Sequence, residues 1–297
     1  MGYAGASRAA CAWLIGLAML SAVMPALAAS GEQASKETVV VTGQRRYDKD
    51  RLEDVLIPQF IQTHGTYTHI DQLSRWRTPV CPVVIGLKPP LDKTLIARVR
   101  DVAAKVGAPV AASCETDVEI FFTDQPQALL DGFVKRHPFV LGYHYIPEEN
   151  ELKTIHYPIQ AWYITATKGG TVRYIDDAYG PTPPGCAGSR LTHCLRSEIV
   201  NVLVIADLTK LEGKPLGPIS DYIAMVVLSR ARTLDACGEL PSIMDLLAPA
   251  CGEVRPEALT FADDAYLKAL YDINMGTIGS TERAEIDFRM RRAIEKQ

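Results

Sequence analysis

The residues with the clearest capacity for chemistry lie in one short loop that begins and ends near two cysteines, Cys186 and Cys194. Between them stand Ser189, Arg190 and His193. A serine or a free thiolate becomes a nucleophile when an imidazole base lies within hydrogen-bond reach, and a guanidinium can hold a carboxylate through two parallel hydrogen bonds. The alternative interpretation, which we favour, is a disulfide-closed loop with a solvated arginine, because no Gly-x-Ser-x-Gly sequence surrounds Ser189.

Metal ligation is a second chemistry that the sequence allows. The six histidines are His64, His69, His137, His144, His156 and His193. None of them forms a metal-binding spacing with another, but histidines that are dispersed in sequence can still converge in a fold. We therefore keep, as an alternative function, a peptidase-like hydrolase with an atypical site in the 185–194 loop or at dispersed histidines. We expect neither a metal nor a cofactor, since the chain has no HExxH sequence and no Walker-type phosphate loop.

The cysteines predict the compartment. One of the seven, Cys11, lies in the N-terminal segment, and the other six form an even set, as expected of disulfides in an exported chain. Their spacing favours pairing between neighbours: Cys81–Cys114, Cys186–Cys194 and Cys237–Cys251. Each such bridge stabilises a fold by about 2–4 kcal/mol, mostly by restricting the unfolded chain.

The N-terminus has the features of a secretory signal peptide. Residues 1–28 combine Arg8, an apolar run over residues 12–24 and a small-residue ending at Ala28. We expect cleavage there, a flexible segment over residues 29–50 and no membrane span in the mature chain, with an uncleaved anchor as the alternative. The mature protein is then periplasmic or secreted.

The charge balance narrows the partner class. The formal net charge is −4 and no basic block is present, which argues against nucleic acid as a partner. An envelope protein or a peptide is the partner we expect.

Periodicity predicts a single globular α+β domain over residues 51–297. Its elements are a helix over 91–106, a strand over 118–122, a helix from 126 to about 137, a hairpin over 159–175, a strand over 199–206, a buried helix over 218–228 and a capped helix after Thr260. The run over residues 79–87 is broken by Pro82, which suits an edge strand or an irregular strand. This order predicts a mixed sheet with packed helices, in α/β-like layers.

The C-terminal part of the chain resembles a known architecture. An apolar strand and a buried helix are followed by Ser242-Ile-Met244, then by Leu259-Thr-x-x-Asp263 and a segment ending at Tyr271. This order is similar to the lower half of metzincin-type zinc peptidases, in which a methionine-bearing turn follows the metal-binding helix. The resemblance implies a zincin-like core.

A second resemblance is to a family of exported proteobacterial proteins of unknown function that are labelled lipoproteins. It depends on Arg75-Trp76-x-x-Pro79-Val80 near the start of the domain and on the Leu-Thr-x-x-Asp and Leu-Tyr patterns near its end.

The departure from the metzincin pattern decides the functional prediction. A zinc-binding helix needs two histidines four residues apart, so that both reach one metal, and a glutamate to activate water. The resemblance aligns Asp221, Tyr222 and Met225 with those positions, and Met244 with the turn beneath them. We therefore expect a non-catalytic, metzincin-like binding or accessory protein.

Overall fold

The structure is a computed structural model that describes residues 38–42, 45–137, 139–142, 150–169, 172–175, 194–253, 255–274 and 279–295. The chain divides into two units, Met1–Ser35 and Lys36–Gln297, and all described residues belong to the second. The predicted signal peptide lies outside the described residues.

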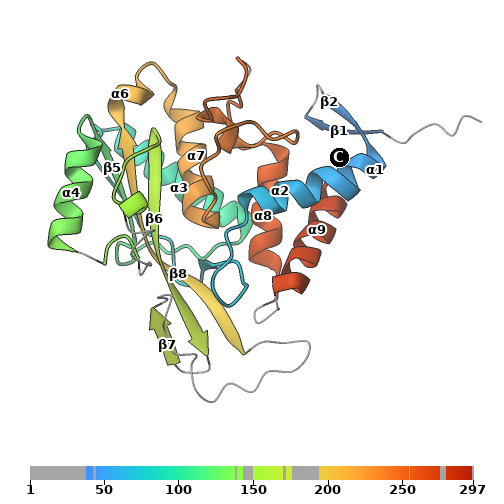
Figure 1. Cartoon of the computed structure of the whole chain (residues 1–297), viewed down its shortest axis with the longest axis horizontal. Helices are drawn as coiled ribbons and strands as arrows, with labels where there is room; N and C mark the ends of the chain where they lie inside the picture. The colour runs from blue at the N-terminus through green and yellow to red at the C-terminus, as the bar shows by residue number, and fades with distance from the viewer. Residues whose placement is uncertain are drawn as a thin grey trace, which may run out of the picture. The chain divides into compact units, whose positions relative to one another are not determined.

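A six-stranded mixed sheet forms the centre of the second unit (Figure 1). Its order is β4-β5-β8-β6-β7, with β3 paired to β8 outside this path. The strands are β3 (Arg75–Trp76), β4 (Pro82–Ile85), β5 (Val118–Thr123), β6 (Ile159–Gly169), β7 (Val172–Ile175) and β8 (Leu195–Asp207). The strands β3, β4, β5 and β8 run parallel to one another. Strand β6 runs antiparallel to its neighbour β8, and β7 runs antiparallel to β6. The predicted mixed α+β class is therefore confirmed, and β4 is the edge strand that Pro82 favours.

Helices cover both faces of this sheet. They are α1 (Lys49–Arg51), the π-helical η1 (Leu52–Leu56), α2 (Ile57–His64), α3 (Leu91–Val106), α4 (Pro126–Arg136), α6 (Leu208–Leu211), α7 (Leu216–Ser229), the 3-10 helix η2 (Ile243–Leu246), α8 (Phe261–Asp272) and α9 (Gly279–Glu295). α3 has the bounds that the periodicity predicts and ends at Gly107, whose positive φ suits a residue without a side chain.

The alternation of side chains along β8 explains the layers. Val202 and Val204 face the large cluster that contains α3 and α7, while Leu203 and Ile205 face a smaller cluster with Leu130 of α4. A strand presents successive side chains to opposite faces, so an uninterrupted apolar run such as that of β8 fits a position buried on both sides.

The carbonyl groups at the C-terminal end of α7 are satisfied by residues from other parts of the chain. Trp76 Nε1 donates to Val227 O at 2.8 Å, and Tyr271 Oη donates to Leu228 O at 2.8 Å. The last carbonyls of a helix have no partner within the helix. Trp76 and Tyr271 therefore serve as donors that hold β3 and α8 against α7.

α7 begins earlier than the sequence predicts. The sequence predicts a helix over residues 218–228, whereas α7 begins at Leu216 with Pro215 as its N-cap. The Ser220 hydroxyl donates to Leu216 O at 2.7 Å within the helix. A serine can bond to the carbonyl four residues before it, so the same residue type serves at a cap and in a helix interior. The capping box predicted at Thr260 and Asp263 is confirmed at the start of α8.

Two of the three expected disulfides lie within the described residues: Cys81–Cys114 and Cys237–Cys251. Cys194 is also disulfide-bonded, whereas Cys186 lies outside the described residues. The bridges are compatible with an oxidising compartment. The segment expected to be flexible, residues 29–50, includes a two-stranded antiparallel ribbon, β1 (Thr38–Thr42) with β2 (Arg45–Asp48). None of the described helices has the length and apolarity needed to span a bilayer.

Candidate functional site

The positions that the metzincin resemblance aligns with zinc ligands are occupied by structural contacts. Asp221 on α7 is buried and forms an ion pair with Arg98 of α3, whose Nη2 lies 3.0 Å from Asp221 Oδ2. The same carboxylate accepts a hydrogen bond from the backbone amide of Leu259 at 2.9 Å. Asp221 therefore ties α3 and the segment before α8 to α7, and its oxygens already have donors.

The other three positions belong to the hydrophobic core. Tyr222, Met225 and Met244 each have 0% of their surface exposed and lie in the large apolar cluster. Burial is also the main cause that raises the pKa of Tyr222. Met244 lies on η2, which packs against α7. The structure thus brings the helix and the methionine turn together, but through side chains that fill the interior rather than line a cleft.

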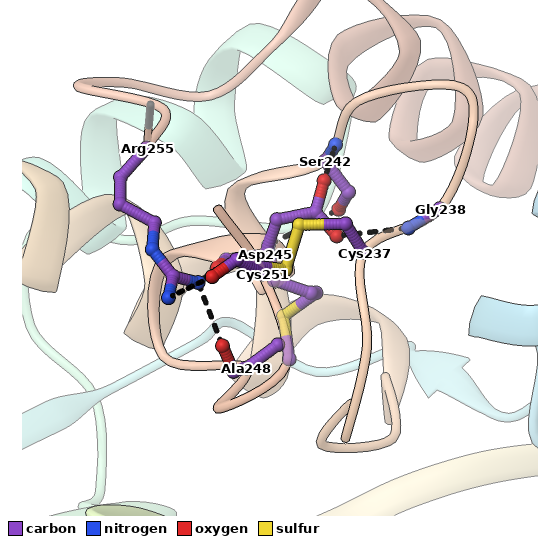
Figure 2. Close-up of a disulfide and its surroundings, with 8 residues drawn as sticks. Cys237, Gly238, Ser242, Asp245, Ala248, Cys251 and Arg255 are labelled. Carbon is purple, nitrogen blue, oxygen red and sulfur yellow. Dashed lines mark hydrogen bonds between the residues drawn. A yellow bond between two sulfur atoms is a disulfide. The ribbon is translucent and has the colours of Figure 1, made fainter. Parts of the chain in front are cut away.

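The segment between Cys237 and Cys251 is held by polar contacts on two sides (Figure 2). Asp245 accepts hydrogen bonds from the backbone amides of Ser242 at 2.9 Å and Gly238 at 3.3 Å. Arg255 donates to the carbonyls of Asp245, Ala248 and Cys251 at 2.6, 2.7 and 3.0 Å. This network fixes the turn that bears Met244.

A second carboxylate links this turn to α8. The fully buried Asp263 accepts from the Ser242 hydroxyl at 2.6 Å and from the Ile243 amide at 2.8 Å. Burial raises the pKa of Asp263 to about 6, although these donors oppose the increase. The turn, which lies within the disulfide-closed segment, is therefore also anchored to the start of α8.

The described residues contain one group of three ligand-type side chains close enough for a metal: Cys237, Asp245 and Cys251. Because the two sulfurs are joined in a disulfide, they cannot serve as thiolate ligands. No histidine joins such a group within the described ranges, which include His64, His69, His137 and His156. Ser189, Arg190 and His193, together with His144, lie outside the described residues.

A pocket of about 670 Å³ lies between α2 and α9, and we call it the α2–α9 pocket. Pro58, Ile61 and Ala284 contribute apolar surface to it, and Arg232 and Arg283 contribute positive charge. Asp287 also lines it, and its carboxylate pairs with Arg291 at 2.7 Å. Apolar walls with a few convergent polar groups are typical of ligand sites.

The segment before β3 positions one wall of the α2–α9 pocket. The buried carboxylate of Glu282 on α9 accepts from the Leu73 amide at 2.8 Å and forms an ion pair of 3.0 Å with Arg75. One residue further along α9, Arg283 pairs with Asp71 at 3.1 Å and its guanidinium lies 4.7 Å from the ring centroid of Tyr67. Glu282 therefore fixes the segment whose side chains orient Arg283.

The two arginines of the pocket differ in their surroundings. Arg283 is engaged by Asp71, and the hydrogen bond to Asp71 is the main cause that raises the pKa of Arg283. Tyr67 lies beneath it, and burial raises the pKa of Tyr67 to about 12. Arg232 is exposed, and no carboxylate pairs with it among the described residues. Arg232 is therefore the available cation of this pocket.

Sequence reasoning missed the residues of this pocket. They are spread over the chain between Pro58 and Asp287, without a shared spacing that would connect them. The one usable signal was the Arg75-Trp76 pattern, whose arginine is buried and paired with Glu282.

Comparisons of this chain with protein-family models, with curated proteins and with solved structures found no match.

Proposed function

We propose that this chain is a non-catalytic binding or accessory protein of the periplasm or the secreted space, built on a metzincin-like core. The observation that carries the proposal is the ion pair between Asp221 and Arg98, at the helix position where the resemblance would require a metal ligand. A carboxylate that already has a guanidinium and a backbone amide as partners is poorly suited to coordinate zinc, because it would have to give up both contacts.

Core packing supports the same proposal. A metal centre that acts on a peptide needs an open coordination position and access for water. Tyr222 and Met225 are instead surrounded by apolar side chains of α3, α8 and η2. On this proposal the order of elements that resembles a peptidase serves as a scaffold.

The α2–α9 pocket gives this scaffold a binding site. Its apolar surface would contact an aliphatic or aromatic side chain, and Arg232 would bind a carboxylate. An envelope peptide or a protein tail that ends in an apolar residue and a free C-terminal carboxylate has this chemistry. We propose this class of partner for the pocket.

Metal analysis tests the first half of the proposal. The mature chain, purified from the periplasm of an expression host and dialysed against Zn²⁺, is expected to contain less than stoichiometric zinc by mass spectrometry. Its zinc content should equal that of an Asp221→Asn variant. One tightly held zinc per chain that is lost in Asp221→Asn would overturn the proposal.

Peptide binding tests the second half. Fluorescence anisotropy of short peptides ending in leucine or phenylalanine should show saturable binding to the free acid and weaker binding to the C-terminal amide. Arg232→Ala is expected to weaken binding of the free acid about tenfold, which is the effect of losing a charge-assisted contact. Arg136→Ala removes one arginine from α4 and serves as the matched control. Equal affinity for acid and amide would contradict the assigned role of Arg232.

A further inference from the structure

A second pocket, of about 600 Å³, lies where the C-terminal end of α3 meets α8 and α9, and we call it the α3–α8–α9 pocket. Four cationic side chains line it: Lys105, Lys268, Arg289 and Arg292. One carboxylate, that of Asp272, lines it as well. The formal net charge of the whole chain is −4, so this concentration of cations stands out against an acidic background.

The four cations fall into two pairs with different surroundings. Lys105 forms an ion pair with Asp264, and Arg289 forms ion pairs with Asp272 and Glu285. These contacts hold two of the cations in place and neutralise them.

The other two cations have no carboxylate partner within the described part of the chain. Lys268 on α8 is exposed, as is Arg292 on α9, whose guanidinium carbon lies 5.6 Å from the ring centroid of Phe288. These two side chains flank the pocket from adjacent helices and are available to a ligand.

The interior of the pocket leaves room for such a ligand. Small side chains from all three helices line it, namely Ala104, Ala265, Ala269 and Ala293. The C-terminal end of a helix directs carbonyl oxygens outward, which would repel an anion. At the end of α3, however, the amides of Gly107 and Ala108 donate to the carbonyls of Ala104 and Ala103, so that these oxygens are already engaged.

We propose that the α3–α8–α9 pocket binds a phosphate group, with Lys268 and Arg292 as its ligands. A phosphate carries up to two negative charges and several acceptor oxygens, and it matches one guanidinium and one ammonium that line the same pocket from neighbouring helices. The same chemistry is present in a soluble phosphate compound and in a phospholipid headgroup. This site is separate from the α2–α9 pocket and does not depend on the function proposed there.

The test uses the full mature chain and two kinds of probe. Pyrophosphate in solution, measured by calorimetry, represents the soluble source, and vesicles of phosphatidylcholine with or without phosphatidylglycerol, measured by co-sedimentation, represent the lipid source. The double variant Lys268→Ala, Arg292→Ala is expected to weaken binding at least about tenfold, since each removed contact is charge-assisted.

The matched control removes the same charge elsewhere. Lys135→Ala with Arg136→Ala takes two exposed cations from α4 and should leave binding unchanged. Thermal unfolding checks that both variants fold. Binding of pyrophosphate supports a soluble ligand, and binding only to vesicles that contain phosphatidylglycerol supports a lipid headgroup.

Two outcomes would overturn the inference. One is the absence of saturable binding to either probe by the unaltered chain. The other is an equal loss of affinity in the site variant and the α4 control, because that would show a general effect of charge. Arg232→Ala should retain phosphate binding, so that failure of the peptide site and failure of this site can be told apart.

Discussion

The region around α7 and the surface of α9 show opposite relationships between sequence pattern and available chemistry. At α7 and η2 the sequence resembles part of an enzyme, yet Tyr222, Met225 and Met244 are fully buried. On α9 no motif is visible, yet its side chains line both cationic pockets. A motif built mainly of apolar residues therefore indicates how a core packs, and it does not by itself indicate a binding site. Ligand chemistry depends on which polar atoms remain exposed.

Buried and exposed charged groups of the chain differ in the same way. Asp221 and Glu282 are buried, and each is committed to an arginine and to a backbone amide. Arg232 and Lys268 are exposed and have no carboxylate partner within the described residues. Buried charges are costly unless they are paired, so the first two should govern stability and the last two should govern binding.

The largest effect on the free energy of unfolding is expected from Glu282→Ala, which would leave Arg75 buried without its counter-ion. Both side chains are nearly inaccessible, at 3% and 1% exposed. Breaking such a pair typically costs about 3–5 kcal/mol. The free energy of unfolding in urea should fall by this amount, and Glu282→Gln, which keeps an acceptor for the Leu73 amide, should cost less. A loss below about 1 kcal/mol would show that this anchor of the pocket wall is dispensable.

A somewhat smaller loss of stability is expected from a substitution at the centre of α7. Met225→Ala removes a fully buried side chain and should cost about 2–5 kcal/mol, because it leaves a cavity. Met225→Leu conserves volume and should cost less than about 1.5 kcal/mol. Chemical unfolding of both variants separates packing from any role that requires the thioether sulfur. A large loss of stability in the leucine variant would argue that the sulfur itself matters.

His64 should give the chain a pH dependence of stability. Its ring is buried, its Nδ1 lies 2.9 Å from Phe60 O, and burial lowers its pKa from 6.5 to about 4. The folded chain therefore binds fewer protons than the unfolded chain between these pH values. The contribution of neutral His64 is complete above pH 6.5 and is lost as the pH falls towards 4.

The size of this contribution is up to roughly 3 kcal/mol, from about 1.4 kcal/mol for each pKa unit. His64→Phe keeps an aromatic ring against Phe60 and should flatten the curve of unfolding free energy against pH in this window. Asp263, whose pKa burial raises to about 6, changes stability in the opposite direction over much of the same range. The difference in unfolding free energy between the variant and the unaltered chain isolates the contribution of His64. If the two curves against pH had the same slope, His64 would not be the source of the pH dependence.

The smallest effect on stability is expected from the double variant Lys268→Ala, Arg292→Ala. Exposed residues without partners usually change the free energy of unfolding by less than about 0.5 kcal/mol. Loss of phosphate binding with an unchanged unfolding midpoint would sharpen the contrast between the two regions. A stability loss comparable to that of Met225→Ala would remove the contrast.

Much of the fold could be predicted because local patterns dictated it. The 3.6-residue period and Gly107 predicted α3, the apolar run after Cys194 predicted β8, and Thr260 with Asp263 predicted the start of α8. The start of this helix was predicted at Pro218, whereas α7 begins at Leu216 and Ser220 bonds within the helix, because a serine hydroxyl can also donate to a carbonyl of the preceding turn.

The candidate sites could not be predicted in this way. Arg98 lies 123 residues from Asp221, and Arg75 lies 207 residues from Glu282. No local pattern connects partners so distant. The contacts exist because α3 packs against α7 and because Arg75 of β3 reaches Glu282 of α9.

The sequence by itself determined the class of fold, the edge position of β4, the proximity of the bridged cysteines and the capped start of α8. All of these depend on short-range periodicity or on spacing along the chain. Only the tertiary structure decided that Tyr222, Met225 and Met244 are packed interior, and that open pockets lined by cations lie along α9. Burial and pairing are properties of the surroundings of a side chain, and those surroundings come from segments far apart in sequence.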